Sequence, residues 1–445
     1  MHPQIIYKLL AKFKQHINTS FSFLENKKLL IAISGGLDSV VLTHLLNQLM
    51  FTISLAHCNF KLRGKESDSD EISVKNLGEK LNLQTFTVGF DTNYYAKENK
   101  LSTQLAAREL RYNWFNELIE THQFDYVITA HHADDNLETF LINLSRGTGL
   151  EGLTGIPAIN NNIVRPLLQF SREEIEQFAK DNAIQWREDA SNASTKYIRN
   201  KIRHQILPVL KEINPNLLDS FKKTTAHLKG SQQIVNDAIE SFKKKAITQS
   251  KNGIMAIDIS KFQEVSNPKA YLFEVLHEYG FTEWNDVVNL LNAQTGKQVV
   301  SKTHRLLKDR GFLLVSEIKP KQETIEYLIL ENTSTIKSPI QLTFETVEEI
   351  TSTDTQLAFF DLEKITFPLI LRKWKSGDYF HPSGMKGKKK ISKFFKDEKY
   401  SLIAKENTWL LCSKNTIIWV VGKRADQRFL ATTISKKILK THLTH

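Results

Sequence analysis

Two periodicities alternate through the first third of the chain, and this alternation restricts it to one class of fold. Short apolar runs that predict buried strands recur at residues 28–34, 52–58, 84–90 and 126–132. Segments with helical spacing follow them at residues 40–50, 71–81, 103–120 and 135–146. Such alternation predicts an α/β fold, a doubly wound parallel sheet with helices on both faces. Ligands bind beyond the carboxyl ends of the strands in these sheets, so functional residues are expected after Ile33, Ala56 and Ala130.

The pattern changes after about residue 210, which predicts further domains in the 445-residue chain. Pro208 and Pro215 bracket a break, and residues 216–247 then have the spacing of one long amphipathic helix. Short alternating runs from residue 340 onward predict a small, mainly β (α+β) domain. The expected organisation is a catalytic domain at residues 1–212, a mainly helical domain at 213–320, a connector at 321–339 and a C-terminal domain at 340–445.

Composition excludes several classes of protein. Only two cysteines occur, Cys58 and Cys412, in no zinc-ligand spacing, so a disulfide framework, a cysteine-based zinc site and an iron–sulfur cluster are not expected. No run of about 18 apolar residues and no signal peptide is evident, which predicts a cytoplasmic protein without a membrane partner. The chain has 60 Lys and Arg residues and 49 Asp and Glu residues, and the resulting net charge of +11 favours a polyanionic partner such as nucleic acid.

The most informative motif is the string SGGLDS, Ser34–Ser39, between the first predicted strand and its helix. Gly35 and Gly36 let the backbone curl so that successive N–H groups face one anion, and the helix N-terminus adds partial positive charge. Asp38 offers a carboxylate that could hold Mg²⁺ against phosphates. An ordinary capped glycine turn would use the same residues, but the full string in this position favours phosphate binding. The chain has no GxxxxGK[ST] string, which excludes a Walker-type loop.

A second group of polar residues, His131–Thr139, follows the fourth predicted strand. If a helix begins near Asp134, then Asp135 and Glu138 share one face of it, three residues apart. Two carboxylates there could bind Mg²⁺, or a cationic substrate whose proton they accept. Acidic residues in a first turn also occur for capping alone, and this is the interpretation we favour for Asp134. His131 and its neighbouring histidine could be zinc ligands, but adjacent strand residues point to different sides and no third ligand is evident. A nucleotide contact or a packed strand end is the interpretation we favour.

The string SGGLDS resembles the pyrophosphate-binding loop of the N-type ATP pyrophosphatases, which split ATP into AMP and pyrophosphate by adenylating their substrate. Further strings are similar to the catalytic domain of the tRNA(Ile)-lysidine synthase family: HCNFKLRG, AARELRY, HHADDNLET, RGTGLEGLTGIP, RPLL and WREDASNAS…YIRNKIRHQILP. The string GDYFHPSGMKGKKKISKFFKDEK resembles the C-terminal domain of that family. These motifs span most of residues 30–208 and 370–430, and the middle is less diagnostic. Phe60 departs from the family, which usually has a histidine there, so imidazole chemistry is excluded at this position.

The resemblance implies a ligase that forms a C–N bond. ATP would adenylate the 2-oxo group of the wobble cytidine in the CAU-anticodon isoleucine tRNA, and the ε-amine of free L-lysine would then displace AMP. The implied ATP-binding residues are Ser34, Gly35, Gly36, Leu37, Asp38, Ser39, His57 and His131, and Asp38 would also hold Mg²⁺. The implied catalytic residues are Asp38, Asp135, Glu138 and Arg111, of which Asp135 and Glu138 would bind the lysine ammonium. Arg111 would face phosphate or developing charge, with a solvated helix arginine as the alternative.

Two basic segments, one after the catalytic motifs and one in the C-terminal domain, are expected to contact the tRNA. The first contains Arg199 and Arg203, and the second contains Lys388, Lys389, Lys390 and Lys393, interleaved with aromatic residues. Basic groups for phosphates and aromatic rings for stacking suit loop RNA. The alternative is a solvated basic surface over an aromatic core, and the periodicity places Phe394 and Phe395 at least partly in that core.

Two other functions share part of this pattern. A tRNA thiolase of the same superfamily would have a similar loop and charge but needs catalytic or cluster-binding cysteines, and only Cys58 lies near a predicted strand end. A catalytically silent tRNA-binding protein would not need Asp38, Asp135 and Glu138 intact. The sequence leaves open whether the protein is a monomer or a homodimer.

Overall fold

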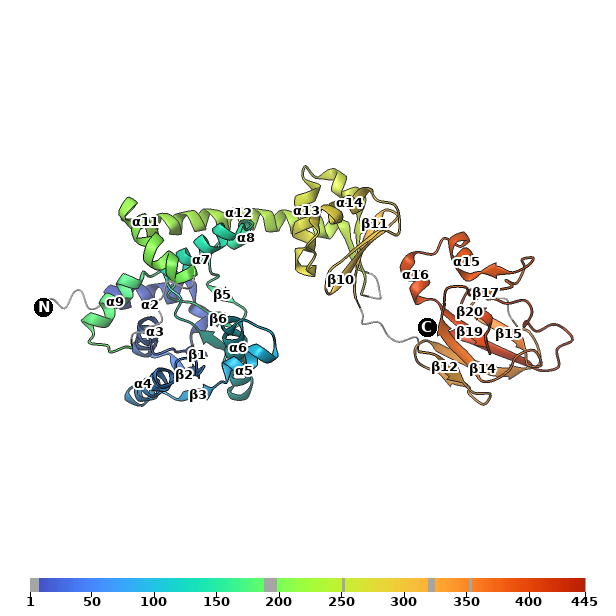
Figure 1. The fold of residues 1–445 in the computed structure, drawn as a ribbon, viewed down its shortest axis with the longest axis horizontal. Helices are drawn as coiled ribbons and strands as arrows, with labels where there is room; N and C mark the ends of the chain where they lie inside the picture. Colours follow the sequence, from blue (N-terminus) through green and yellow to red (C-terminus); the bar gives the residue numbers. More distant parts are fainter. Residues whose placement is uncertain (1–7, 188–197, 250–252, 319–324, 352–353, 445) are drawn as a thin grey trace. The chain divides into compact units, whose positions relative to one another are not determined.

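The computed structural model describes residues 8–187, 198–249, 253–318, 325–351 and 354–444 (Figure 1). Residues 188–197, which include most of the predicted motif WREDASNAS, lie outside the described residues. The chain divides into two compact units, Met1–Asn236 and Asp237–His445, and each is described by itself. Within the described residues, no helix has the length and apolar character needed to cross a membrane.

The first unit is built on a six-stranded sheet with the order β3-β2-β1-β4-β6-β5. Its members are β1 (Lys28–Ala32), β2 (Thr52–Asn59), β3 (Thr85–Gly89), β4 (Tyr126–Ile128), β5 (Ile159–Asn160) and β6 (Ile163–Val164). All neighbouring strands run parallel except β5 and β6, which pair antiparallel. The four strands predicted from the sequence are therefore confirmed, and their carboxyl ends meet at one edge of the sheet.

Helices cover both faces of this sheet, as the sequence predicts. Alternate residues of a strand point to opposite faces, so Leu29 and Ile31 pack with α2 (Lys8–Ser20), α3 (Leu37–Gln48) and α9 (Arg172–Asp181). Leu30 points the other way and packs against α6 (Thr103–His122). All three strand residues are fully buried, and burying each such side chain stabilises the fold by about 1.5–3 kcal/mol. Burial on both faces explains why the strand has an unbroken apolar run.

Several elements of the first unit were not predicted from the sequence. The helix α4 (Lys65–Leu81) begins earlier than expected, and α5 (Thr92–Glu98) was missed. The two-residue strands β5 and β6 are too short to show a periodicity, and Asn161, with a φ of 51°, makes the turn between them. This hairpin lengthens the sheet beside β4.

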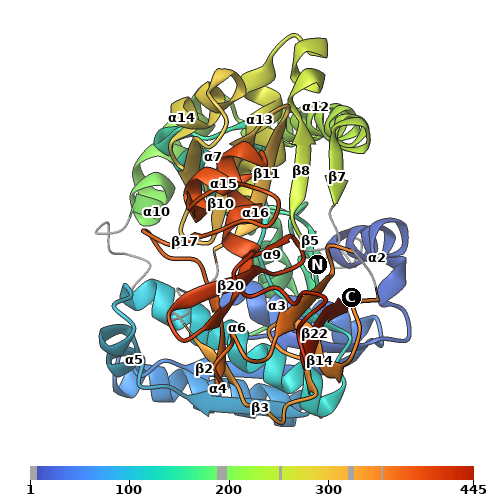
Figure 2. The ribbon, with the colours of Figure 1, turned by 90° about the vertical axis from the view of Figure 1, so that its right-hand side faces the viewer.

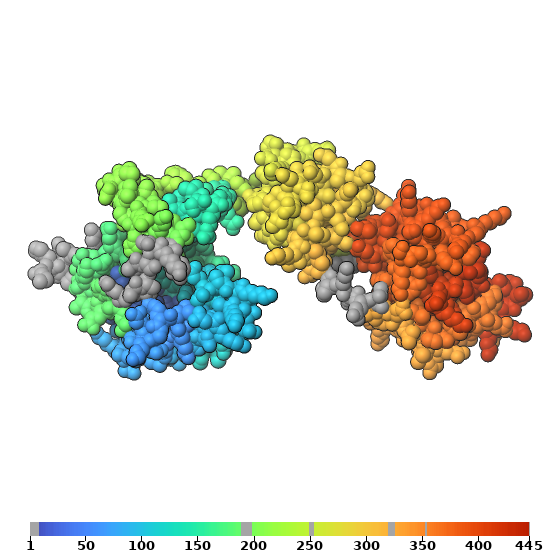
Figure 3. All heavy atoms as spheres, in the orientation of Figure 1, coloured from blue at the N-terminus to red at the C-terminus, as the bar shows by residue number. Residues whose placement is uncertain are grey.

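The chain continues through the helices α7 (Ala133–Arg146), α8 (Leu150–Leu153), α10 (Ile198–Lys201), α11 (Leu207–Ile213) and α12 (Leu217–Ala246), with the π-helix η3 (Ile202–Ile206) before α11. In Figure 3 the green atoms of α11 and α12 lie next to the teal atoms of α7 and α8. Leu137, Ile202, Leu207 and Phe221 form the apolar contact that joins α7 to this helical segment. The long helix predicted at residues 216–247 is confirmed as α12.

The middle region also contains a five-stranded antiparallel sheet, with the order β7-β8-β11-β10-β9, which the sequence analysis did not identify. Its strands are β7 (Ile247–Gln249), β8 (Met255–Asp258), β9 (Gln298–Val300), β10 (His304–Asp309) and β11 (Phe312–Glu317), and its helices are α13 (Pro268–Leu276) and α14 (Trp284–Asn289). Three of these strands have four residues or fewer, so their alternation is too brief to be recognised.

The C-terminal part is mainly β, as predicted, with helices α15 (Ile391–Asp397) and α16 (Leu402–Asn407). One antiparallel sheet contains β12 (Tyr327–Ile329), β16 (Leu369–Lys373), β19 (Trp409–Ser413), β20 (Thr416–Val420) and β21 (Arg424–Ala425). The other contains β13 (Thr335–Ile336), β14 (Gln341–Val347), β22 (Ile438–Thr444) and β15 (Leu357–Asp361), and Figure 2 shows β14 beside β22. The strands β12 and β13 fall inside the predicted connector and pair with β16 and β14.

Candidate active site

The loop Ser34–Ser39 connects β1 to α3 and has the geometry of an anion-binding turn. Gly35 has a φ of 88°, which only glycine adopts readily, and Gly36 begins the helix without a side-chain cap. The uncapped N–H groups and the helix dipole are both available to an anion. The Ser39 hydroxyl accepts from the Ser34 N–H at 3.2 Å and donates to the Gly36 carbonyl at 3.0 Å, which fixes the curl of the loop. The Leu37 side chain lies in the core, so only its backbone can face a ligand.

Asp38, in the first turn of α3, has one oxygen that is paired and one that is not. Its Oδ2 accepts from Arg172 Nη1 at 2.8 Å and lies 3.7 Å from His132 Nε2. Its Oδ1 is buried and has no hydrogen-bond partner among the described residues. A buried unpartnered carboxylate oxygen beside a phosphate loop fits a metal ligand. No group of three His, Cys, Asp or Glu side chains suited to a metal ion occurs in the described ranges, so substrate phosphates would have to complete the shell of a Mg²⁺ ion.

A cavity of about 260 Å³ opens beside this loop and is lined by Ser34, His57, Cys58, Arg63 and Arg111 among others. His57 Nδ1 lies 2.9 Å from the Ile33 carbonyl, and burial lowers the pKa of this histidine. The Arg111 guanidinium lies 5.1 Å from the centre of the Phe60 ring. The structure thus brings together three predicted site residues, Ser34, His57 and Arg111, with Phe60, whose aromatic ring contacts the arginine.

Cys58 lines the same cavity but is not a reactive thiol. Burial raises its pKa to about 12, even though Arg111 acts in the opposite direction. At neutral pH such a side chain is a neutral thiol and a poor nucleophile. Cys412 is fully buried in the C-terminal core, where it packs as a small apolar residue.

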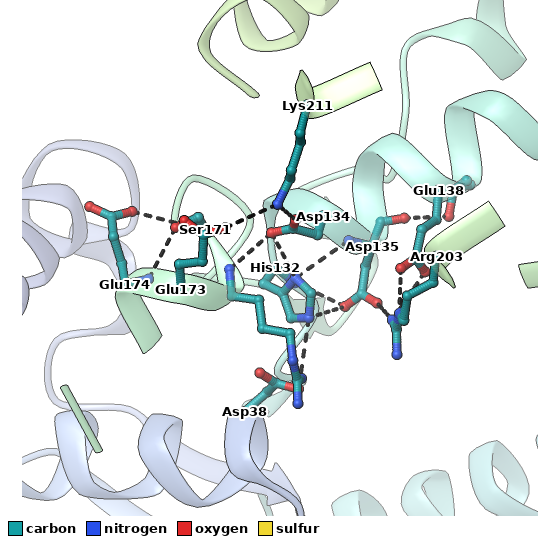
Figure 4. Close-up of polar contacts among 12 residues, drawn as sticks. Asp38, His132, Asp134, Asp135, Glu138, Ser171, Glu173, Glu174, Arg203 and Lys211 are labelled. Carbon is teal, nitrogen blue, oxygen red and sulfur yellow. Dashed lines mark hydrogen bonds and ion pairs between the residues drawn. The ribbon is translucent and has the colours of Figure 1, made fainter. Parts of the chain in front are cut away.

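The second predicted group lies at the start of α7, beside the loop (Figure 4). His132, not Asp134, is the N-cap of this helix: its ring Nδ1 accepts from the Asp135 N–H at 3.4 Å, and Asp135 Oδ2 accepts from the His132 N–H at 3.1 Å. Because Nδ1 accepts a hydrogen bond, the ring hydrogen is on Nε2, which lies 3.4 Å from Asp135 and 3.7 Å from Asp38. His132 therefore links the carboxylate of the loop to the carboxylate of α7.

Glu138 is fully buried and is paired with two arginines. Its Oε2 accepts from Arg199 Nε at 2.8 Å, and its Oε1 accepts from Arg203 Nε at 2.6 Å. Arg203 Nη2 also donates to Asp135 Oδ1 at 3.1 Å. Burial disfavours the charge of Arg203, but its hydrogen bond to Glu138 raises its pKa overall. Burial likewise opposes the charge of Asp135, yet His132 and Arg199 hold its pKa below the ordinary value.

The two arginines that the sequence predicted for RNA contact thus lie on the carboxylates predicted for lysine. The side chains of Arg199 and Arg203 keep 41% and 24% of their surface exposed. The sequence did not predict these ion pairs, because the arginines follow Glu138 by about sixty residues. The arrangement is a site that already holds cations at neutral pH.

Asp134 points away from this pair and joins α7 to other helices. It accepts from the Arg172 N–H at 2.9 Å and from Lys211 Nζ at 3.0 Å. Asp134 lies in the first turn of α7, as predicted, but His132 is the N-cap, and Asp134 instead contacts residues of α9 and α11. Arg172 and Lys211 were not singled out in the sequence, and no motif marks them.

His131 follows β4 and is partly buried, with its Nδ1 3.0 Å from the Thr129 hydroxyl. Burial lowers its pKa to about 4, and the charges of Arg165 and Arg199 act in the same direction, against that of Asp135. A histidine of this kind is neutral at pH 7 and can donate or accept a hydrogen bond without carrying charge. Such a group is compatible with the predicted nucleotide contact.

The basic residues of the C-terminal domain differ in their exposure. Lys388, Lys390 and Lys393 are exposed, whereas Lys389 is half-buried and pairs with Asp397 at 2.8 Å. Lys388 Nζ lies 3.4 Å from the centre of the exposed Tyr379 ring. The aromatic residues Phe380, Phe394 and Phe395 are buried in a core cluster, so their rings are not available for base stacking. The prediction that Phe394 and Phe395 belong to the core is confirmed.

A phosphate-binding loop at the carboxyl edge of a doubly wound sheet, with Asp38 beside it and an acidic helix facing it, defines a PP-loop nucleotide-binding enzyme. The PP-loop domain model matches residues 6–210, the model of the TilS substrate binding domain matches residues 249–318, and that of the TilS substrate C-terminal domain matches residues 369–440. The tRNA(Ile)-lysidine synthase of Parabacteroides distasonis is 40% identical over 421 residues, which are 93% of this chain and 95% of that one. The chain belongs to the tRNA(Ile)-lysidine synthase family.

A second relative with the same name, from Bacteroides thetaiotaomicron, is 39% identical over 428 residues, 96% of this chain and 97% of its own. Among solved structures, the U34-tRNA thiolase NcsA from Methanococcus maripaludis aligns with a TM-score of 0.42 and 18% identity over 51% of this chain and 80% of its own. A crystal structure of a TilS C-terminal domain aligns with a TM-score of 0.24 and 18% identity over 27% of this chain and 99% of its own. The family resemblance seen in the sequence motifs is therefore confirmed by the family models and the curated relatives.

Proposed function

We propose that this protein is a ligase that joins free L-lysine to C2 of the wobble cytidine in the CAU-anticodon isoleucine tRNA. The observation that carries the proposal is the position of a phosphate loop and a cation-holding carboxylate pair at the same edge of one sheet. ATP would supply the activating adenylyl group, and the modified base would pair with A in place of G. Relatives named tRNA(Ile)-lysidine synthase over nearly the whole chain support this proposal.

In the first half-reaction the 2-oxo group of the cytosine attacks the α-phosphorus of ATP, and pyrophosphate leaves. The N–H groups at the start of α3, with the glycine backbone and serine hydroxyls of the loop, would bind the departing pyrophosphate, in place of the 3.3 Å hydrogen bond that Gly36 N–H donates to Ser34 Oγ. A bound Mg²⁺ ion would neutralise charge on the phosphates, and Asp38 Oδ1 is the oxygen suited to hold it. The neutral His131 and the buried His57 are suited to hydrogen-bond the nucleotide without adding charge.

In the second half-reaction the lysine ε-amine attacks C2 of the adenylated cytosine, the C–N bond forms, and AMP leaves with the former oxygen. Asp135 has a low pKa and is therefore a carboxylate at neutral pH, which suits it to bind the incoming ammonium. Only the neutral amine is nucleophilic, and its nitrogen becomes strongly acidic as the bond forms, so a carboxylate in contact can accept the proton. The guanidinium groups of Arg199 and Arg203 already at this place support a site for a cation.

Space for the reacting base lies beside α7. A cavity of about 650 Å³ is lined by Ala133, Asn136, Arg165 and Lys211, together with residues of α2, α9 and α12. This volume lies in the range of ordinary ligand sites of roughly 300–1,000 Å³. Arg165 is among the residues that line this cavity, and it is 5% exposed and held by its Nη1, which donates to the Pro157 carbonyl at 2.8 Å.

Neither alternative function gains support from the site. A thiolase would need a reactive cysteine, and Cys58 is a neutral thiol while Cys412 is buried. A silent RNA-binding protein would have no use for a buried, unpartnered Asp38 oxygen beside a phosphate loop. We also propose that tRNA phosphates meet Lys388, Lys390 and Lys393, which are exposed. A homodimer stays a prediction.

The deciding experiment is an incubation with ATP, Mg²⁺, labelled lysine and unmodified CAU-anticodon isoleucine tRNA, followed by mass analysis of the nucleosides. We expect label in the wobble cytidine and one AMP for each lysine incorporated. Asp38→Asn should abolish both while leaving tRNA affinity unchanged. Asp125→Asn is the matched control, because Asp125 pairs with Lys27 and the Lys28 backbone just before β4, away from the loop. Pyrophosphate release without lysine incorporation would refute the lysine assignment, and tight tRNA binding without ATP turnover would favour the silent binder.

A further inference from the structure

The two oxygens of the Asp38 carboxylate differ in their contacts, and an arginine from a distant helix causes the difference. Asp38 lies in the first turn of α3, and its Oδ2 accepts from Arg172 Nη1 at 2.8 Å. Arg172 is the first residue of α9 and follows Asp38 by 134 residues. Asp38 Oδ1 is buried and has no hydrogen-bond partner in the described ranges of the chain. The arginine thus contacts the oxygen that is not suited to hold a metal ion.

The backbone of Arg172 is held in place where its side chain extends to Asp38. The Arg172 N–H donates to Asp134 Oδ2 at 2.9 Å. Asp134, whose side chain is 9% exposed, also accepts from Lys211 Nζ at 3.0 Å, as Figure 4 shows. A series of hydrogen bonds therefore runs from Lys211 on α11 through Asp134 and Arg172 to Asp38. This series sets the point from which the guanidinium group approaches the carboxylate.

The pair of Arg172 and Asp38 is not needed to pack α9 against α3. Buried apolar residues of both helices, such as Val41 and Ile175, already belong to one core cluster. The two charged side chains are 39% and 25% exposed, and an ion pair of this kind contributes less than about 1 kcal/mol to stability. A cation in the first turn of a helix is also disfavoured by the helix dipole, and the next two residues of α9 are glutamates. The position of this arginine is therefore better explained by what it does to Asp38.

A second donor lies close to the same oxygen of Asp38. His132 Nε2, which carries the ring hydrogen, is 3.7 Å from Asp38 Oδ2. The terminal torsion of an aspartate has broad minima, so the partners of the carboxylate decide where its two oxygens point. Arg172, at 2.8 Å, is the closer of the two partners. Without its guanidinium group the carboxylate would turn toward His132, and Oδ1 would leave its present position in the loop.

We propose that Arg172 is a positioning residue for Asp38: it holds Oδ2 so that Oδ1 stays directed toward the Mg²⁺ ion that accompanies ATP. Arg172 acts through Asp38 and does not itself bind the metal ion. Asp134 contributes by fixing the backbone of Arg172. This role rests on the proposed function only in that Mg²⁺-ATP is the nucleotide bound at this loop, and it extends that function to two residues outside the SGGLDS motif.

The test measures how much Mg²⁺ increases the affinity for ATP. Calorimetry gives the ratio of ATP affinities with Mg²⁺ and with a chelator for wild type, Arg172→Gln, Arg172→Lys, Asp38→Asn and the double variant Asp38→Asn with Arg172→Gln. Arg172→Gln should lower this ratio about threefold to tenfold, the range for loss of a partly exposed charge-assisted hydrogen bond. A ratio that is unchanged or higher would overturn the role, because an arginine that only repels the metal ion would give that result.

The double variant shows whether Arg172 acts through Asp38. In the Asp38→Asn background, Arg172→Gln should change the ratio by less than about twofold, since no carboxylate is left to position. An equal fall in both backgrounds would overturn the role. Arg172→Lys keeps the charge but loses the planar group, and its ratio should lie between those of wild type and Arg172→Gln. If Arg172→Gln does not fold, Arg172→Lys decides, and a ratio equal to that of wild type would refute the proposal.

Lys180→Gln is the matched control, because Lys180 lies on the same helix, carries the same charge and pairs with Glu176 at 2.6 Å. It should keep the wild-type ratio, and a fall equal to that of Arg172→Gln would reveal a general charge effect and overturn the role. Wild-type ATP binding that does not respond to Mg²⁺ would overturn it as well. Absence of lysine incorporation by the wild type would instead refute the proposed function and leave these binding results unchanged.

Discussion

Loss of the Glu138 carboxylate should be costly to the stability of the first unit. It is fully buried, and Arg199 and Arg203 donate to it at 2.8 and 2.6 Å. Glu138→Gln keeps the shape but removes the charge and places an amide group where an oxygen accepted from a guanidinium. Two positively charged groups would then face each other with only Asp135 between them. We expect a clear loss of stability for a change of so few atoms.

The magnitude follows from burial. Removing one partner of a fully buried ion pair costs about 3–5 kcal/mol. The two arginine side chains keep 41% and 24% of their surface exposed and can turn toward water, which relieves part of the penalty. We therefore expect a loss of about 2–3 kcal/mol in the free energy of unfolding. For a unit of this size that loss corresponds to a fall in Tm of about 4–12 °C.

The assay is thermal and urea unfolding of Glu138→Gln, with Glu176→Gln as the control. Glu176 pairs with Lys180 at 2.6 Å on the surface of α9, where such a pair contributes less than about 0.5 kcal/mol. Combining Glu138→Gln with Arg203→Gln should recover part of the lost free energy of unfolding, because the double variant no longer has the Arg203 charge without its Glu138 partner. We expect a coupling energy between the two substitutions of roughly 1–3 kcal/mol. Equal unfolding midpoints for Glu138→Gln and Glu176→Gln would refute the claim that this pairing organises the site.

Three further outcomes are expected. Replacing Lys388, Lys389 and Lys390 by Gln should weaken tRNA binding without changing ATP affinity. The slope of log K against log salt should become shallower by about 0.9 for each phosphate that is no longer neutralised. An unchanged slope would show that these three lysines do not contact the tRNA. His131 has a pKa of about 4 against 6.5 when unfolded, so only the unfolded chain gains its proton between those values and stability falls as pH drops from 6.5 to 4. His131→Gln should lose less stability than wild type over that range in urea titrations. Because the pKa of Cys58 is raised to about 12, iodoacetamide at about pH 7.5 should alkylate it far more slowly than a free thiol, and rapid labelling would reopen the thiolase hypothesis.

The sequence was sufficient for the parts of the fold that depend on local periodicity. The strand at residues 28–32 has an apolar run because it is buried on both faces, and the SGGLDS loop follows it as predicted. The two-residue strands β5 and β6, and the short strands of the middle sheet, exist only through pairing with their neighbours. Nothing in their own residues distinguishes them from loops, because their stability comes from tertiary contacts.

The sequence likewise predicted the parts of the site that lie within one motif, but not the contacts between motifs. Residues of one motif, such as Ser34 and Ser39, were found together because they are close in sequence. Contacts between motifs were missed: Arg203 on Glu138, Arg172 on Asp38, and Arg187 on the Gly35 carbonyl. A basic residue in a sequence has the same appearance whether it meets RNA, a phosphate or a buried carboxylate. Only the fold decides between these partners.

The hydrogen bonds of Arg199 and Arg203 also distinguish Asp135 from Glu138, the two carboxylates that were expected to share the lysine ammonium. Glu138 is fully buried and accepts from both arginines, so an ammonium could reach it only by displacing both guanidinium groups. Asp135 keeps 15% of its side chain exposed and accepts one hydrogen bond from Arg203, at 3.1 Å. An ammonium could replace that single hydrogen bond while Glu138 still held Arg203 through its Nε at 2.6 Å. Within the proposed reaction we therefore expect Asp135 to contact lysine and Glu138 to keep the two arginines in place.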